Sequence, residues 1–164
     1  MLSAWTPLAP GDAGIRTVLR RLVALKDYYG RLPEIRAAAL VIAGSGVDHD
    51  EMGHVARLFS WVQRKLVYVS DPFNAELIVT PDVLLVEIDR DGSASGDCDD
   101  HVLLYAALAE SLGIRTTPVA VKTPDSAVWN HVIAVSTLDD GRTLSLDLIA
   151  KGIPQPVYSE TLVL

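Results

Sequence analysis

The sequence predicts an α+β domain in which helices come first and an antiparallel β-hairpin follows. Apolar residues recur at helical spacing in the first 66 residues, and an alanine- and leucine-rich helical run begins near residue 98. From residue 129 to residue 148, two β-branched or alternating segments flank an Asp-Gly turn. With 164 residues, 49% of them hydrophobic, the chain can form one domain with a sizeable core.

Three helices are expected in the N-terminal part. The first ends at a break over residues 30–33, the second runs from Pro33 to about Ala43, and the third runs from about Asp50 to Leu66. Asp48 or Asp50 is expected to cap the third helix. The apolar stripe of the first helix consists of Val18, Leu19, Leu22, Val23 and Leu25.

Weaker patterns mark the chain ends and one long connection. Residues 1–10 are expected to form an irregular arm, and residues 73–97 a long connection whose one strand-like run is Val83–Ile88. The proline-broken tail from residue 151 is expected to fray or to dock on a partner. The expected organisation is a single domain over 1–164, with a helical part (1–66), a catalytic core (67–150) and a tail (151–164).

Cys98, the only cysteine in the chain, is expected in the first turn of a helix. Asp97 is a favourable N-cap residue, and Gly113 suits the C-terminal cap. The unpaired N–H groups and the positive end of the helix dipole favour a thiolate at this position. Asp99 and Asp100 oppose it, because like charges raise a thiol pKa, so a cationic histidine partner is needed.

A β-hairpin with the three-residue loop Asp139-Asp140-Gly141 supplies this histidine. In the register that this loop sets, Ile133 faces Asp147. His131 and Asp147 are then diagonal neighbours on one face of the hairpin. We expect the carboxylate of Asp147 to hold the imidazole of His131 in one tautomer.

Cys98, His131 and Asp147 together predict a catalytic triad. The Cys98 thiolate would attack a peptide or carboxamide carbonyl, His131 would act as base and acid, and Asp147 would orient the imidazole. The resulting acyl-thioester would be resolved by water or by an amine, and the sequence leaves both open. The backbone N–H of Cys98 is the expected oxyanion donor, with the second donor unassigned.

Three motifs resemble the transglutaminase-like superfamily: Gly96-Asp97-Cys98-Asp99-Asp100 before the helix, Asn130-His131-Val132, and a strand ending in Leu146-Asp147. The resemblance covers roughly residues 68–149. It implies a papain-like core, in which a cysteine-bearing helix packs on an antiparallel β-sheet that carries the histidine and the aspartate.

Within that superfamily, residues 68–72, Glu76 and Thr80-Pro81 are similar to small bacterial proteins that are often encoded among tailed-phage and prophage structural genes. This similarity implies a phage structural protein as a partner, besides a protein or peptide substrate. It also leaves open a non-catalytic binding or assembly module on the same fold.

Other interpretations of these residues are weaker. NlpC/P60 cell-wall amidases generally show Asp-Cys-Ser-Gly, whereas two aspartates follow Cys98 here. His101 would point along the helix surface instead of meeting a substrate. Four adjacent residues, 98–101, cannot all converge on one metal ion, and His49 and His54 lie in a segment that we interpret as structural. We expect no metal and no cofactor.

The formal net charge of −7 argues against a nucleic-acid partner. The basic group in the first helix is expected on its solvent-exposed face; it comprises Arg16, Arg20, Arg21 and Lys26. No apolar run has the length of a membrane span, and no leader pattern opens the sequence. We therefore expect a cytoplasmic protein, virion-associated if phage-encoded. Its oligomeric state is left open.

Overall fold

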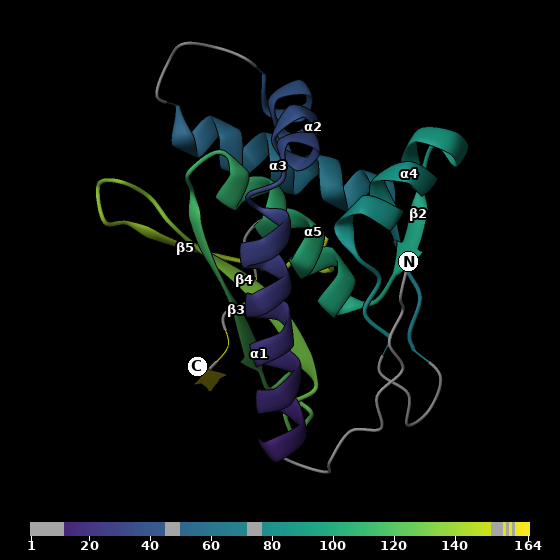
Figure 1. The fold of residues 1–164 in the computed structure, drawn as a ribbon. Coiled ribbons are helices and arrows are strands. Elements are labelled where there is room, and N and C mark those ends of the chain that lie inside the picture. Colours follow the sequence, from purple (N-terminus) through teal and green to yellow (C-terminus); the bar gives the residue numbers. More distant parts are fainter. Residues whose placement is uncertain (1–11, 45–49, 72–76, 152–155, 157, 159) are drawn as a thin grey trace.

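The computed structural model describes residues 12–44, 50–71, 77–151, 156, 158 and 160–164, which form five helices and six strands (Figure 1). The helices are α1 (Asp12–Tyr29), α2 (Pro33–Ala43), α3 (Glu51–Lys65), α4 (Pro81–Asp91) and α5 (Cys98–Ser111). The strands are β1 (Leu66–Tyr68), β2 (Ala94–Gly96), β3 (Arg115–Val121), β4 (His131–Thr137), β5 (Thr143–Leu146) and β6 (Thr161–Leu162).

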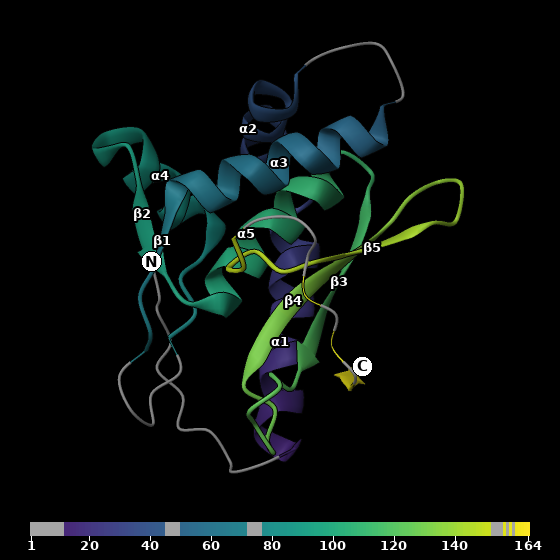
Figure 2. The same cartoon turned by 180° about the vertical axis from the view of Figure 1, so that it is seen from behind.

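Helix α5 is the central element of the core. Its residues from Asp99 to Ala109 are all buried, which is the pattern of a helix surrounded on every side. The other four helices and strands β3 and β4 all contact it. Seen from both sides, α1 and α5 cover one face of the larger sheet (Figures 1 and 2). The predicted α+β architecture, with a cysteine-bearing helix packed on an antiparallel sheet, is confirmed.

The four-stranded sheet has the order β5-β4-β3-β6, and its neighbouring strands are antiparallel. Ala134 pairs with Leu146, and the Leu138 N–H donates to the Arg142 carbonyl at 2.9 Å. Gly141 closes the turn with a φ of 84°, a left-handed conformation that glycine adopts without strain. This is the hairpin register that the three-residue loop predicts.

The predicted ends of the helices are confirmed where a local cap sets them. Helix α2 has the predicted bounds, with Pro33 in its first turn. The Asp50 side chain caps α3 by accepting from the Gly53 N–H at 2.8 Å. Asp97 caps α5, and Gly113 follows that helix with a φ of 89°.

One strand-like run proves to be helical. Val83–Ile88 lies within α4, where Leu84 and Ile88 are buried one turn apart. Tertiary burial of this face outweighs the β propensity of its valines and isoleucine. The connection also contains β2, a Ser- and Gly-rich strand that pairs in parallel with β1, and β3 was not predicted either. The three residues of β2 leave too short a pattern to recognise, a reason that does not extend to the seven residues of β3.

Two further expectations are corrected. Lys26 lies in the core instead of on the wet face of α1, because it forms ion pairs with Glu110 at 2.7 Å and with Asp27 at 2.8 Å. The tail does not simply fray, since Thr161–Leu162 forms β6 and pairs with β3.

Some sequence predictions fall outside the described residues: the N-terminal arm, Asp48, His49, Pro72 and Glu76. Among the described helices, none combines the length and the hydropathy needed to cross a bilayer.

Candidate active site

Hydrogen bonds at the head of α5 place Cys98 in the first helical position. The Asp97 carboxylate accepts from the backbone N–H groups of Asp99 at 2.9 Å and Asp100 at 3.4 Å. The Asp100 carboxylate accepts from the Asp97 N–H at 3.1 Å, which completes a capping box, and from the Val79 N–H at 2.7 Å. These bonds fix the residues on both sides of Cys98.

Gly96 is required at this helix start by close packing. A Cβ atom at Gly96 would lie 2.6 Å from Cβ of Asp100, a distance that real side chains do not show. Asp100 itself is buried. Burial, together with the charge of Asp97, raises the pKa of Asp100 to about 8, against the hydrogen bonds from the Val79 and Asp97 backbones.

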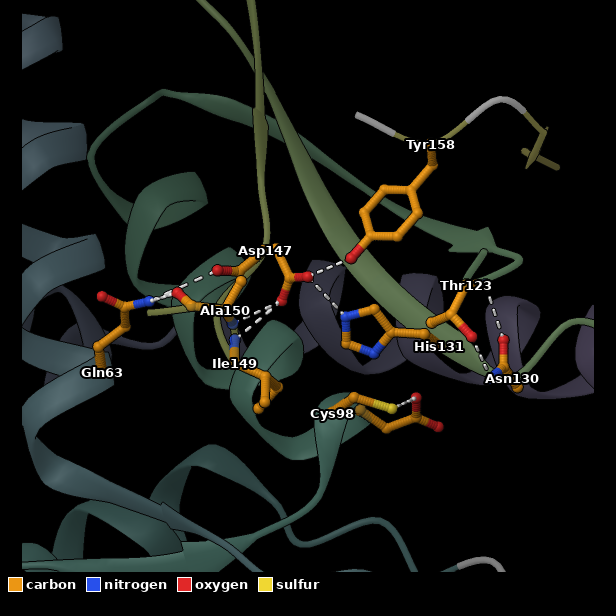
Figure 3. Close-up of polar contacts among 10 residues, drawn as sticks. Gln63, Cys98, Thr123, Asn130, His131, Asp147, Ile149, Ala150 and Tyr158 are labelled. Carbon is orange, nitrogen blue, oxygen red and sulfur yellow. Dashed lines mark hydrogen bonds and ion pairs between the residues drawn. The ribbon is translucent and has the colours of Figure 1, made fainter. Parts of the chain in front are cut away.

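The thiol of Cys98 is directed at a carboxylate in this structure. Its Sγ donates to Oδ1 of Asp99 over 3.6 Å (Figure 3). Burial, followed by the charges of Asp99 and Asp97, raises the thiol pKa well above its ordinary value, and a hydrogen bond from the Val132 backbone opposes this. Asp97, and not Asp100 as expected, is therefore the second carboxylate that disfavours the thiolate.

His131 is the first residue of β4 and faces Asp147. Its Nε2 lies 3.0 Å from Oδ2 of Asp147, and its side chain is 13% exposed. In Figure 3 the other ring nitrogen, Nδ1, is on the side that faces Cys98. A proton on Nε2, donated to the carboxylate, leaves the Nδ1 lone pair on the side of the thiol. In the described part of the chain, no hydrogen bond joins the thiol to His131.

Asp147 has hydrogen-bond donors on both carboxylate oxygens. Oδ1 accepts from the backbone N–H groups of Ile149 at 2.9 Å and Ala150 at 3.0 Å. Oδ2 accepts from the Tyr158 hydroxyl and faces His131. Burial alone would raise the pKa of Asp147, but the bonds from His131 and Tyr158 lower it to about 2. Asp147 is therefore ionised at neutral pH.

Gln63, on α3, supports the turn that follows β5. Its side-chain amide donates to the Ala150 carbonyl at 2.7 Å and reaches the Asp147 carbonyl at 3.5 Å. Helix α3 thus helps to fix the backbone that carries the Asp147 carboxylate.

Cys98 and His131 both line a cleft with a volume of about 440 Å³. One wall comes from the start of α1, and another comes from residues 127–130, before β4. Trp129 joins these two walls, because its Nε1 donates to Oδ1 of Asp12 at 2.9 Å. The side chains of Cys98 and His131 therefore face a space that can admit a ligand.

The structure brings the three predicted residues together, with Cys98 and His131 on one cleft and Asp147 behind His131 (Figure 3). Tyr158, whose hydroxyl also binds this carboxylate, was not predicted from the sequence. A lone tyrosine in a proline-broken tail has no periodic signal, so the sequence contained no clue to this contact.

The structure explains His101, the alternative candidate for the base, and the group of potential metal ligands at the start of α5. His101 is buried outside the lining of the cleft, with Nδ1 2.6 Å from the Asp97 carbonyl, and burial lowers its pKa. Potential ligand atoms of Asp97, Cys98 and Asp99 lie within 4.8 Å of one another. The carboxylate of Asp97 already caps α5, so this proximity follows from the helix start.

Comparison with known proteins gives a likeness in fold. No family model matches the chain, and no curated protein matches its sequence. A putative protease from Parabacteroides distasonis aligns with a TM-score of 0.58 and 15% identity, over 84% of this chain and 26% of that one. A putative cysteine protease from Cytophaga hutchinsonii aligns with a TM-score of 0.54 and 14% identity, over 87% of this chain and 45% of that one. This chain thus spans less than half of either protein, and the likeness is consistent with a papain-like core.

Proposed function

We propose that this protein is a thiol-dependent acyl hydrolase or acyltransferase of the transglutaminase-like kind. Cys98 is the nucleophile, His131 the general base and acid, and Asp147 the residue that orients the imidazole. The observation that carries the proposal is the 3.0 Å contact between His131 Nε2 and Asp147 Oδ2, with Nδ1 of His131 left on the side of Cys98. The substrate class is a peptide or a carboxamide.

Catalysis begins with a rotation of the Cys98 side chain from Asp99 toward His131. The thiol proton passes to Nδ1, and the imidazolium that forms is stabilised by the ionised Asp147. This pairing offsets the burial and the carboxylate charges that keep the resting thiol protonated. The reactive state is thus an ion pair formed when the thiol leaves Asp99.

The thiolate then attacks the carbonyl carbon, and a carbon–sulfur bond forms as the carbonyl oxygen takes up negative charge. The backbone N–H of Cys98, in the first turn of α5, makes no hydrogen bond among the described residues and can donate to this oxygen. The carbon–nitrogen bond breaks as the imidazolium gives its proton to the leaving amine. An acyl-thioester on Cys98 remains.

The second half of the reaction regenerates the thiol. His131 takes a proton from water, which attacks the thioester carbonyl and releases a carboxylic acid; an amine in place of water gives a new amide. The sulfur leaves and recovers a proton from the imidazolium. The same residues serve hydrolysis and transfer, so the acceptor that enters the cleft decides between them.

A second candidate is a binding or assembly module on the same fold. The thiol contact with Asp99 and the raised thiol pKa favour it, because both describe an inert cysteine. In that case the cleft would bind a protein partner, and a phage structural protein is the class that the sequence resemblance suggests.

The pH dependence of Cys98 alkylation by iodoacetamide separates these two functions. For an enzyme we expect reactivity that extends well below pH 8 in the wild type and is lost in His131→Ala. His54→Ala is the matched control, because His54 lies on α3 away from the cleft lining. Ordinary thiol reactivity that is the same in all three folded proteins would contradict the triad and favour the binding module.

A further inference from the structure

The C-terminal segment is held in register with the histidine of the site. Thr161 on β6 pairs with Val121 on β3, and Val121 pairs with His131 on β4. These three residues form a row across the sheet. Glu160 adds an ion pair with Lys122 at 2.8 Å. The segment is therefore anchored to strand β3, at the residue that pairs with His131.

Tyr158 reaches the site from this anchored segment. Its ring packs against the small apolar cluster of Val119, Val121 and Ile133. The ring centroid lies 6.1 Å from that of His131, with an interplanar angle of 59°. In Figure 3, Tyr158 and Cys98 lie on opposite sides of the imidazole. The tyrosine thus covers the side of His131 that faces away from the nucleophile.

The hydroxyl of Tyr158 completes the coordination of Asp147. It donates to Oδ2, the same oxygen that faces His131 Nε2, while the backbone N–H groups of Ile149 and Ala150 occupy Oδ1. A carboxylate held by four donors has little freedom to rotate away from the imidazole. A ring beside the contact between His131 and Asp147 also limits the access of water to it.

We propose that Tyr158 is a positioning residue of this site, and the proposal rests on the proposed function. Its hydroxyl holds Oδ2 of Asp147 toward His131, and its ring shields the Nε2 proton from water. Together these contacts keep Nδ1 of His131 directed to the side of Cys98. Tyr158 does not itself line the cleft, and it acts through its contacts with His131 and Asp147.

The test is the NMR signal of the His131 Nε2 proton and its exchange with water. In the wild type we expect a resolved downfield signal that exchanges slowly. Tyr158→Phe keeps the ring and removes the hydroxyl, so the signal should shift and exchange about tenfold faster, because a hydrogen bond to a charged group is lost. In Tyr158→Ala the signal should be lost through rapid exchange. Tyr28→Phe, on the exposed surface of α1, is the matched control and should match the wild type.

Two outcomes would overturn the proposal. The first is that the Nε2 proton of His131 in Tyr158→Phe keeps the chemical shift and the exchange rate of the wild type. This result would show that Tyr158 has only a packing role, even if the variant has a lower thermal stability. The other is a proton that already exchanges rapidly in the wild type. Neither outcome depends on a reactive thiol. A failure of the triad would instead appear as His131-independent alkylation of Cys98.

Discussion

The candidate site has a base side, His131 with Asp147, and a nucleophile side, Cys98, and the two differ in hydrogen bonding and in the pKa of their acidic groups. On the base side, Asp147 is held by Ile149, Ala150 and Tyr158, and its pKa falls to about 2. On the nucleophile side, Cys98 bonds to Asp99, and burial and neighbouring charge raise the pKa of its thiol. The carboxylate of Asp147 is therefore ionised and held in place, whereas the thiol of Cys98 is protonated and hydrogen-bonded to Asp99.

This difference follows from the groups that surround each side chain. Asp147 lies where donors converge on it, and hydrogen bonds to an ionised group outweigh its burial. Cys98 lies between two carboxylates at a helix start, and their charges oppose the favourable helix dipole. In the proposed mechanism, the controlled step is the movement of the thiol from Asp99 to His131.

Replacing Asp147 by asparagine should prevent His131 from acting as a base. The amide would favour the wrong imidazole tautomer, with the proton on Nδ1 facing the thiol, and a comparable change in a serine-protease triad costs about 10⁴-fold. We expect steady-state hydrolysis of p-nitrophenyl acetate to fall about 1,000-fold relative to the wild type, with Cys98→Ala as the blank. Asp140→Asn, on the exposed hairpin loop, should leave turnover unchanged. Turnover of Asp147→Asn within threefold of the wild type would contradict this role.

Replacing Gly96 by alanine should damage the nucleophile side through packing. The new Cβ would overlap the buried Asp100 side chain, and relief of this overlap has to move the head of α5. We expect a loss of about 3 kcal/mol in the free energy of unfolding, measured with denaturant. Gly141→Ala, with a positive φ and no heavy atom within 4 Å of its Cβ, should cost only about 1 kcal/mol. Equal costs would show that the overlap with the Asp100 side chain is relieved at little cost in stability.

Acid should weaken the fold through Asp147. The pKa of this group falls from 3.8 to about 2 on folding, so its contribution is complete above pH 4 and is lost as the pH drops toward 2. The difference corresponds to about 2 kcal/mol. The free energy of unfolding of the wild type should therefore fall more steeply between pH 4 and pH 2 than that of Asp147→Asn. Parallel curves for the two proteins would assign the acid sensitivity to other carboxylates.

Replacing Asp99 by asparagine should make the resting thiol more reactive. The substitution removes a negative charge next to Sγ, which lowers the pKa of Cys98 and raises the thiolate fraction. We expect alkylation by iodoacetamide at pH 7 to become about tenfold faster, the change that one pKa unit produces. Asp89→Asn, on the exposed face of α4, is the matched control. An unchanged rate would show that burial and the charge of Asp97, and not the charge of Asp99, set the reactivity of the thiol.

Features that depend on neighbouring residues could be predicted from the sequence alone. Asp97 and Gly113 mark the ends of α5, and Asp50 marks the start of α3, because a cap satisfies backbone groups within one turn. The loop closed by Gly141 sets the hairpin register, and this register places His131 and Asp147 on one face. Such signals act over a few residues and can be recognised without knowing the fold.

The tertiary structure decided the features that depend on burial and on distant parts of the chain. The helical state of Val83–Ile88 and the burial of Lys26 depend on partners from other elements. The contact of Tyr158 with Asp147 and the raised pKa of Cys98 depend on how the C-terminal segment and β4 pack around the site. Desolvation and long-range hydrogen bonds arise only when the chain is folded. For this reason the sequence predicted that Cys98, His131 and Asp147 would lie close together, whereas the folded structure raised the pKa of Cys98 and lowered that of Asp147.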